Sequence, residues 1–237
     1  MTAQNFEQNR SQFLEKLAKK MGRPLQTVPA AFDNPVNNHP QTRLTDRTPE
    51  RLVEEFMETA KTMLVDVNVA SEAEAAAKMV ELCEKYGGGA IVLNKDERLE
   101  ALGITQAVTA KFDSHVWSPE TAEENLAKSE KANIGIVFAE YGLTETGGIA
   151  LFSDKDRGRS VSLLPEKSIV VVRKSTVLPR VAQLATVLHQ KAQAGERMPS
   201  CVNIISGPSA TADIELIKVV GVHGPVQKIY LVIDDLA

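Results

Sequence analysis

The stretch that decides the fold runs from residue 201 to residue 225 and reads CVNIISGPSATADIELIKVVGVHGP. It opens with an apolar run, Val202–Ile205, of the length expected for a buried strand. The run ends at the turn cluster Ser206–Ser209, and a second glycine-containing turn closes the stretch at 221–225. Because ligands of α/β proteins usually bind in loops at strand ends, we expect these two turns to carry a site.

A short helix is expected between the two turns. Thr211-Ala212-Asp213 places oxygen-bearing side chains directly before an apolar stretch, which is the pattern of a helix N-terminus. Thr211 then either caps the helix or contacts a ligand. Asp213 either complements the helix dipole or, together with Glu215, orients a basic or hydroxyl group.

The composition is that of an ordinary globular protein. The 237 residues are 43% hydrophobic and 24% charged, which suffices for a sizeable core. The net charge of -4 argues against a nucleic-acid binder that depends on a positive field. No apolar run approaches the length of a membrane span, and residues 1–22 lack the apolar core of a signal peptide, so we expect a cytoplasmic protein. Cys83 and Cys201 stand in no paired motif, which favours reduced thiols.

Helices and strands alternate along the chain. The patterns predict helices at 48–64, 71–83, 96–102, 118–131 and 177–193, and strands at 65–69, 90–93, 105–109, 133–139, 149–152, 161–164, 168–173, 201–205 and 228–233. This alternation favours the α/β class, with a largely parallel sheet covered by helices on both faces. Short connections between 149 and 173 indicate antiparallel hairpins inside a mixed sheet.

The first 47 residues differ from the rest. Residues 5–20 predict an amphipathic helix, and the following stretch to about residue 46 contains four prolines, which indicates an extended arm. The arm is either a surface strap or a segment that packs on a neighbouring subunit, the second case implying a homo-oligomer. We therefore expect an N-terminal helix and arm, 1–47, and an α/β domain, 48–237.

A second candidate loop, EYGLTETGG at 140–148, follows the buried strand 133–139. Its glycines, Gly147 among them, allow the backbone to approach a ligand, and Glu145 and Thr146 supply a carboxylate and a hydroxyl. A poorly solvated Glu145 would have a raised pKa and could act as a base or a nucleophile. The alternative is a solvated loop glutamate.

The turn at 206–209 carries the binding hypothesis. Ser206, Gly207, Pro208 and Ser209 could bind a carboxylate or phosphate through amides and hydroxyls, or could form a turn that satisfies only itself. In the second turn His223, between Gly221 and Gly224, could move a proton to or from a hydroxy acid near neutral pH, or be a structural histidine. The remaining histidines show no ligand spacing, so no metal site is expected.

Three segments together carry a resemblance: FAEYGLTETGG at 138–148, SGPSATADIE at 206–215 and GVHGP at 221–225. They resemble the lactate-utilization protein C family, also called the LUD-domain family, over roughly Arg51 to the end. The resemblance implies a three-layer α/β/α sandwich with a mostly parallel, mixed sheet, similar to the sugar-phosphate isomerase and CoA-transferase superfamily. It also implies a role in oxidising L-lactate to pyruvate beside two iron–sulfur partner subunits.

The chain itself has no cluster-binding cysteines, no dinucleotide fingerprint and no obvious flavin motif. We therefore expect no cofactor in this chain and iron–sulfur clusters in its partners. The Glu145 loop, the Ser206 loop and His223 should meet at one rim of a sheet and bind a small anion there. Two alternatives stay open: a non-catalytic assembly or regulatory subunit, and a stand-alone enzyme that handles acyl groups or sugar phosphates.

Overall fold

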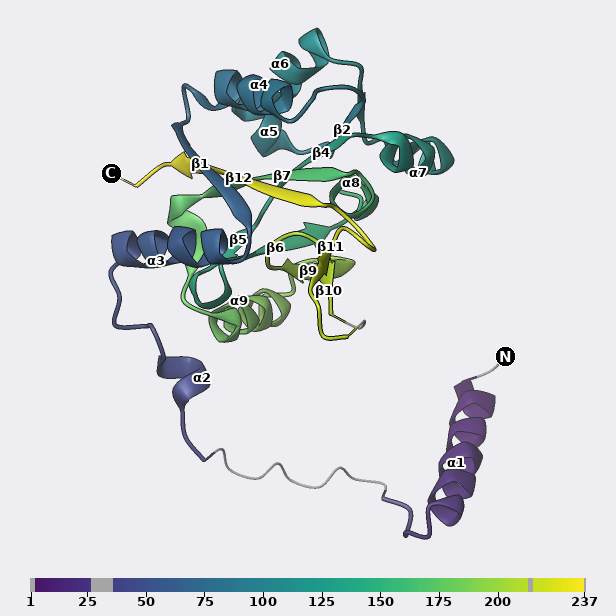
Figure 1. The fold of residues 1–237 in the computed structure, drawn as a ribbon. Helices are drawn as coiled ribbons and strands as arrows, with labels where there is room; N and C mark the ends of the chain where they lie inside the picture. Colours follow the sequence, from purple (N-terminus) through teal and green to yellow (C-terminus); the bar gives the residue numbers. More distant parts are fainter. Residues whose placement is uncertain (1–2, 27–35, 213–214, 237) are drawn as a thin grey trace. The chain divides into compact units, whose positions relative to one another are not determined.

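Figure 1 shows the chain as a computed structural model that describes residues 3–26, 36–212 and 215–236. Its contacts fall into two compact units, Met1–Asn38 and His39–Ala237; the boundary expected at residue 47 stays a prediction. The smaller unit contains helix α1, Ala3–Lys20, where a helix was expected. Part of the expected arm lies outside the described residues, at 27–35. No helix in the described ranges is both long and apolar enough to span a bilayer.

The larger unit is organised around a parallel sheet of six strands in the order β1-β12-β7-β4-β2-β3. Its strands are apolar because helices or a second sheet cover both faces. Strand β12 lies between β1 and β7, with Lys228 paired to both Val65 and Ser168. The strands are β1 Val65–Ser71, β2 Ile91–Leu93, β3 Ser114–Val116, β4 Ile134–Phe138, β7 Lys167–Arg173 and β12 Gln227–Asp234.

One face of this sheet is covered by three helices, α4, α5 and α6, which form the upper layer in Figure 1. They contribute fully buried side chains such as Met79 and Leu99, which join Ile229 and Leu231 of β12 in one core cluster. Gly103, in the left-handed region at φ 68°, makes the turn between α5 and α6. The helices are α4 Ala75–Lys85, α5 Glu97–Ala101 and α6 Ile104–Lys111.

The opposite face packs against helices and a second, four-stranded sheet of order β8-β5-β6-β9. Phe56 of α3 stacks on Tyr230 of β12 with ring centroids 5.8 Å apart, and α9 covers the far side of the second sheet through Leu184. The elements are α3 Pro49–Thr62, α7 Ala122–Lys131, α8 Ser160–Leu163, α9 Val181–Gln193, β5 Tyr141–Leu143, β6 Gly148–Ser153, β8 Val177–Leu178 and β9 Cys201–Ile205.

Four short elements complete the larger unit. The first is a one-turn helix, α2 His39–Thr42. Two short 3-10 helices follow, η1 Thr144–Thr146 and η2 Lys174–Thr176. The last is a two-stranded antiparallel ribbon of β10, Ala210–Thr211, and β11, Val219–Val220.

The predicted α/β class with a mostly parallel sheet between helices is confirmed. The antiparallel strands, however, pair with one another in the second sheet and not inside the central one. Residues 161–164 were expected to be a strand, but 160–163 form α8, whose backbone lies so close to Gly135 that an added Cβ would be 1.8 Å from the Val161 oxygen. Residues 104–111 form α6 and not a strand, because Ile104 and Val108 bury the same helical face.

The expected helix after Thr211 is wrong as far as the described residues show. Thr211 belongs to β10 and pairs with Val219 of β11. Two of the intervening residues that the structure describes, Glu215 and Leu216, have positive φ angles of 54° and 59°. Such angles break a right-handed helix, so the segment turns back on itself and forms the ribbon.

Candidate functional site

The candidate loop at 140–148 and the turn at 206–209 lie side by side. Strand β6 pairs antiparallel with β9, with Ile149 opposite Ile205, and this register brings Gly148 next to Ser206. A Cβ added at Gly148 would lie 2.4 Å from the Ser206 Oγ and 2.9 Å from the Thr146 Oγ1. A larger residue at position 148 would therefore have to displace the Ser206 and Thr146 side chains.

A buried tyrosine joins the same two loops. The Tyr230 hydroxyl donates to the Gly147 carbonyl oxygen at 3.2 Å and accepts a hydrogen bond from the Gly207 amide. Burial raises the pKa of this phenol, so it stays a neutral donor. Gly207, at φ 76°, passes so close to Met63 that a Cβ would be 2.3 Å from the Met63 carbonyl oxygen. Tyr230 therefore fixes the distance between the loops from beneath.

Next to this junction is a cavity of about 320 Å³, which we call the amino-edge cavity. The Ser209 amide donates to the Pro225 oxygen at 2.9 Å and the Gly221 amide to the Ser209 oxygen at 2.8 Å, which ties two walls of the cavity together. No Asp or Glu occurs among the described residues of its lining. The lining consists of Ser162 and Leu163 of α8, Ile204 and Ile205 of β9, the turn Ser206–Ser209, the turn His223–Pro225, and Lys228.

Lys228, which begins the apolar part of β12, is the fully buried charged side chain of this cavity. Only 2% of it is exposed, and its Nζ donates to the Ser168 Oγ at 2.9 Å. Among the described residues no carboxylate forms an ion pair with it. Burial lowers the pKa of Lys228 to about 7. A substantial fraction of this amine is therefore unprotonated near neutral pH, which is unusual for lysine.

The cavity lies at the amino edge of the central sheet. Lys228 and Ser168 are near the starts of β12 and β7, and the Ser206 turn reaches them because β9 belongs to the second sheet. The turn does follow a strand, as expected, but the carboxyl edge of the parallel sheet, where such proteins usually bind ligands, is elsewhere.

Glu145 does not line this cavity. Its Oε2 is 2.6 Å from the Arg180 Nε and its Oε1 is 3.3 Å from the Arg43 Nη1, with 22% of the side chain exposed. Arg180 also donates to the His39 carbonyl oxygen at 2.9 Å. The carboxylate thus links η1 to α2 and to the start of α9. A catalytic role for Glu145 stays a prediction, and in this geometry the carboxylate faces two guanidinium groups.

The other predicted residues divide into those at the cavity and those away from it. Ser206, Gly207, Pro208, Ser209, His223 and Gly224 line it, His223 as an exposed side chain. Gly221, at φ 83°, shapes the turn beside it. Thr146, Gly147, Thr211 and Glu215 are not part of its lining, and Glu215 is exposed. Asp213 lies outside the described residues.

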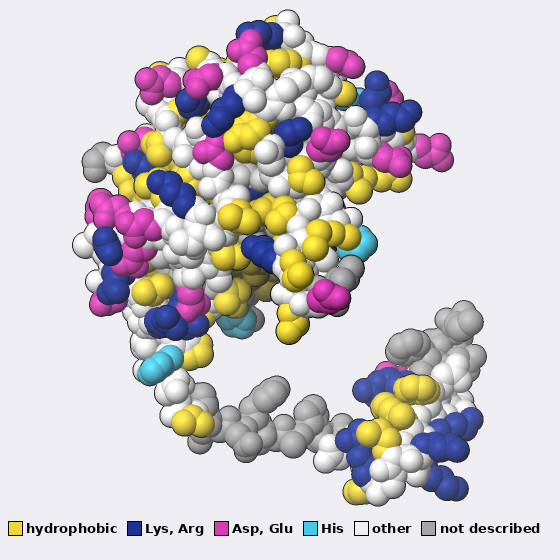
Figure 2. Space-filling view, in the orientation of Figure 1, with side chains coloured by type: hydrophobic (Ala, Val, Ile, Leu, Met, Phe, Trp, Pro, Cys, Tyr) yellow, Lys and Arg dark blue, Asp and Glu magenta, His cyan; other side chains and the backbone are white. Residues whose placement is uncertain are grey.

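An apolar surface borders the cavity. Figure 2 shows hydrophobic side chains gathered over β10 and β11 on one face of the larger unit. Ile204, which is 46% exposed, belongs both to this surface and to the cavity lining. The other large apolar side chains exposed in this segment are Leu216, Ile217, Val219, Val220, Val222 and Val226.

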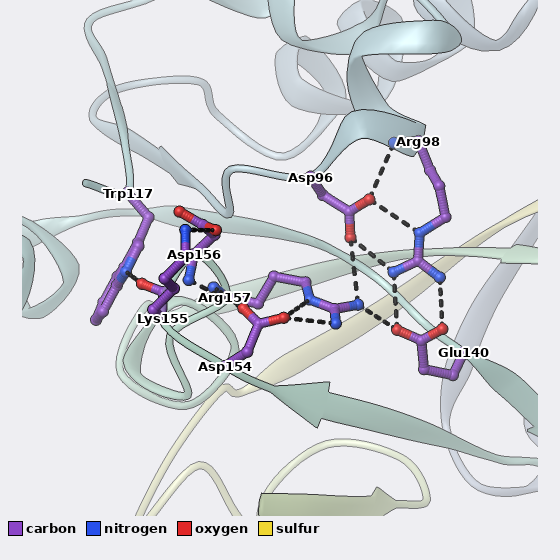
Figure 3. Close-up of polar contacts among 8 residues, drawn as sticks. All are labelled: Asp96, Arg98, Trp117, Glu140, Asp154, Lys155, Asp156 and Arg157. Atoms are coloured by element: carbon purple, nitrogen blue, oxygen red, sulfur yellow. Dashed lines mark hydrogen bonds and ion pairs between the residues drawn. The ribbon is translucent and has the colours of Figure 1, made fainter. Parts of the chain in front are cut away.

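The carboxyl edge of the central sheet carries a different arrangement, shown in Figure 3. Five paired charged residues form what we call the carboxyl-edge cluster: Asp96, Arg98, Glu140, Asp154 and Arg157. Arg98 bonds Glu140 and Asp96 at 2.7 Å each, and Arg157 bonds Asp154 at 2.7 Å and also Glu140. The guanidinium of Arg98 also lies 4.3 Å from the centre of the Phe138 ring.

Burial and pairing act against each other in this cluster. Burial alone would lower the pKa of Arg98, but hydrogen bonds to Asp96 and Glu140 raise it. Burial would raise the pKa of Asp154, yet bonds from Arg157 and from backbone amides lower it. Arg98 and Asp154 therefore stay charged, and each is compensated by the partners it bonds. The charged turn after β6 is anchored through Arg157, which bonds both Asp154 and Glu140.

Two features of the site escape sequence reasoning. The carboxyl-edge cluster joins residues far apart in the chain, so its partners depend on the sheet order. For Lys228 the sequence does contain an indication of burial, because this residue shares a sheet face with Tyr230 and Val232 in a strand that is buried on both sides. In the described ranges no group of three or more His, Cys, Asp or Glu side chains is arranged to hold a metal ion.

Comparison with known proteins identifies the family to which the chain is related. The family model described as LUD domain matches residues 53–233. The chain is 54% identical to the uncharacterized protein YkgG of Escherichia coli, over 96% of this chain and 99% of that protein. It is 36% identical to lactate utilization protein C of Bacillus licheniformis and of Bacillus subtilis, in each case over 96% of this chain and 97% of the relative.

A solved structure agrees with the fold. The crystal structure of a DUF162 family protein from Deinococcus radiodurans superposes with a TM-score of 0.57 at 20% identity, covering 79% of this chain and 99% of that one. The likeness supports the architecture around the cavity and nothing about its ligand. From the family match and the relatives that span nearly its whole length, the chain belongs to the LUD domain family.

Proposed function

We propose that this chain is a cytoplasmic subunit of a system that oxidises L-lactate to pyruvate, together with iron–sulfur partner subunits, and that its amino-edge cavity binds a small carboxylate. The names of the relatives, lactate utilization protein C, support the system. The observation that carries the binding role is Lys228, a buried cation-forming group without a described carboxylate partner in a cavity without described acidic lining.

The physical argument concerns charge. A buried ammonium group is costly unless an anion compensates it. A carboxylate in the cavity would provide that compensation through a charge-assisted hydrogen bond. The Ser206 and Ser209 side chains and His223 line the same cavity and can donate to the remaining carboxylate oxygen. The charge of the cavity lining therefore favours a small anion over a cation or an apolar ligand.

Two amides in the Ser206 turn are already occupied. Gly207 donates to Tyr230, and Ser209 donates to Pro225. The binding mode proposed here accordingly depends on side chains, Lys228 first, and less on the backbone cradle expected from the sequence. In the same proposal His223 exchanges a proton with the ligand, and electrons leave through clusters held by the partners.

Binding is tested by isothermal titration calorimetry of the full chain with pyruvate and with L-lactate. Substituting Lys228→Met should weaken binding by about tenfold or more, because the charge-assisted bond is lost. The matched control is Lys167→Met on the adjacent strand. The Lys167 Nζ already has partners in Asn133 at 2.6 Å and Glu166 at 3.4 Å. Equal affinities of wild type and Lys228→Met would contradict the proposal.

Participation in lactate oxidation is tested by growth on L-lactate of a strain that lacks its own copy of the protein. The wild-type gene should restore growth and Lys228→Met should not, with both proteins present at equal amounts. Glu145→Gln tests the catalytic assignment separately. If this variant folds and supports normal growth, Glu145 is not catalytic.

A second candidate, a non-catalytic assembly or regulatory subunit, is favoured by one observation. Glu145 is engaged by Arg180 and Arg43 and does not line the cavity. In that case the cavity would sense a small anion, and Lys228→Met would leave oxidation by the purified complex intact but remove its response to added pyruvate. Loss of oxidation at every pyruvate concentration would favour the first candidate.

A further inference from the structure

Lys228 has a property that anion binding alone does not use. Near neutral pH its amine is deprotonated in a substantial fraction of molecules, because burial disfavours the ammonium form. A neutral amine has a lone pair and is a nucleophile toward carbonyl carbons. Lys85 shows the opposite case, because its bond to Asp66 at 2.7 Å raises the pKa of this exposed amine.

The geometry gives this amine both access and a fixed position. Lys228 lines the amino-edge cavity although it is 98% buried, so a ligand in the cavity reaches it while bulk water is largely excluded. Its hydrogen bond to the Ser168 Oγ at 2.9 Å fixes the position of the Nζ. A nucleophile held beside its reaction partner gains from proximity, since no orientation has to be found in solution.

We propose that Lys228 forms a Schiff base with the carbonyl carbon of a 2-oxo acid bound in the amino-edge cavity. This inference rests on the proposed function, which places pyruvate, the simplest methyl-bearing 2-oxo acid, in the same cavity. It narrows the ligand class from small carboxylates in general to those with an adjacent carbonyl group, and it makes the binding reversible and covalent.

The chemical step balances without any further reactant. The Lys228 Nζ lone pair attacks carbon 2 of the 2-oxo acid and forms the new C–N bond, while the carbonyl oxygen takes up a proton. The resulting carbinolamine loses its hydroxyl group together with a nitrogen proton as one water molecule, which leaves a C=N bond. No atom is oxidised or reduced, and water reverses the reaction.

The lining explains why a 2-oxo acid fits better than a neutral carbonyl compound. The imine nitrogen is positively charged when protonated, and the described lining supplies no carboxylate to compensate it. The carboxylate of the ligand itself supplies that charge. His223 lines the same cavity and can exchange the proton that the departing hydroxyl group requires.

Reductive trapping tests the proposal. The full chain is incubated with pyruvate and sodium cyanoborohydride, which reduces an imine to a stable secondary amine, and the modified lysines are located by peptide mass spectrometry. We expect modification of Lys228 to exceed that of Lys167 at least about tenfold, since Lys228 lines the cavity and its amine is deprotonated in a substantial fraction of molecules. L-Lactate, which has no carbonyl group, should compete at Lys228 and leave exposed lysines such as Lys61 unaffected.

Calorimetry on the same wild-type protein separates this inference from the proposed function, because binding of pyruvate does not require an adduct. Lys228→Arg cannot form an imine and should show no adduct at position 228. If wild type binds pyruvate but Lys228 gains no adduct, the Schiff base is refuted and the anion site stands. If wild type neither binds pyruvate nor gains an adduct, both are refuted. An adduct at Lys228 that L-lactate suppresses confirms the inference.

Discussion

At the carboxyl edge of the central sheet Arg98 lies between two carboxylates, whereas at the amino edge Lys228 has only the hydroxyl of Ser168 as a partner. Both side chains are mostly buried, Arg98 on α5 at one edge of the sheet and Lys228 on β12 at the other. The first is part of a compensated network that fastens the turn after β6, and the second borders a cavity. The difference separates paired charges that stabilise the fold from a buried amine that has no described carboxylate partner. A buried charge without such a partner is costly unless it is neutralised or a ligand compensates it.

The largest loss of stability should come from removing an ion-pair partner from the carboxyl-edge cluster. Arg98→Met leaves Asp96, whose side chain is 4% exposed, with Arg157 at 3.9 Å as its nearest remaining cation. We expect the free energy of unfolding to fall by about 3 kcal/mol, because a buried carboxylate loses its main partner. Urea denaturation measures the loss. Arg51→Met, which removes solvent-screened ion pairs on α3, is the control and should lower the free energy of unfolding far less.

At the amino edge the expected effect depends on pH. The pKa of Lys228 is lowered to about 7 in the folded protein, against about 10.4 in an unfolded chain. Between these values the unfolded state binds more protons, so the stability rises with pH and falls as the pH is lowered towards 7. The slope contributed by Lys228 should be up to about 1.4 kcal/mol per pH unit.

Urea denaturation at pH 7.5 and at pH 9 measures this dependence. The free energy of unfolding should be about 2 kcal/mol higher at pH 9 than at pH 7.5. Lys228→Met removes the titrating group, and its stability should lack this increment. At neutral pH the same variant should be more stable than wild type, because on folding much of the wild-type protein must release from Lys228 a proton that the unfolded chain retains. Parallel pH profiles for the two proteins would show that Lys228 is charged in the fold.

A smaller effect should follow from separating the two loops at the cavity. Tyr230→Phe removes the hydroxyl that bonds Gly147 and Gly207 but keeps the ring stacked on Phe56. We expect a loss of about 1–2 kcal/mol in stability, because a buried carbonyl and a buried amide lose their partner. Calorimetry should also show weaker pyruvate binding, since the Ser206 turn is less well fixed. Tyr141→Phe, on the second sheet, serves as the control.

The smallest effect is expected at Glu145. Its carboxylate is partly exposed and lies outside the cavity. Glu145→Gln should therefore lower the free energy of unfolding by about 1 kcal/mol or less. Pyruvate affinity measured by calorimetry should stay that of wild type. Should the affinity drop sharply, the Glu145 loop contributes to the cavity more directly than its contacts with Arg180 and Arg43 indicate.

Sequence patterns found the strands that position the cavity. The apolar run at 201–205 and the hydroxyl-rich turn after it were both recognised, because a strand followed by Ser-Gly-Pro-Ser has few alternative conformations. The ribbon at 210–220 was not, since Thr211 and the apolar residues after Asp213 fit a helix start equally well. Positive φ angles at Glu215 and Leu216 decide the outcome, and no short-range pattern encodes them.

The charged residues were harder to place from the sequence. Lys228 was expected only as the first residue of a strand, where a lysine is usually solvated. Its burial follows from β12 lying in the middle of the sheet, with the Ser206 turn above it, and both depend on the full topology. The cluster around Arg98 likewise depends on β2 and β4 being neighbours.

The central position of β12 has a consequence for how the protein is made. Strands β1 and β7 are synthesised well before β12, yet each pairs with it and not with the other. The nascent chain therefore exposes two open strand edges until residue 234 has left the ribosome, a state prone to incorrect pairing. Since Lys228 arrives with that same strand, closure of the central sheet and completion of the amino-edge cavity occur in a single folding event.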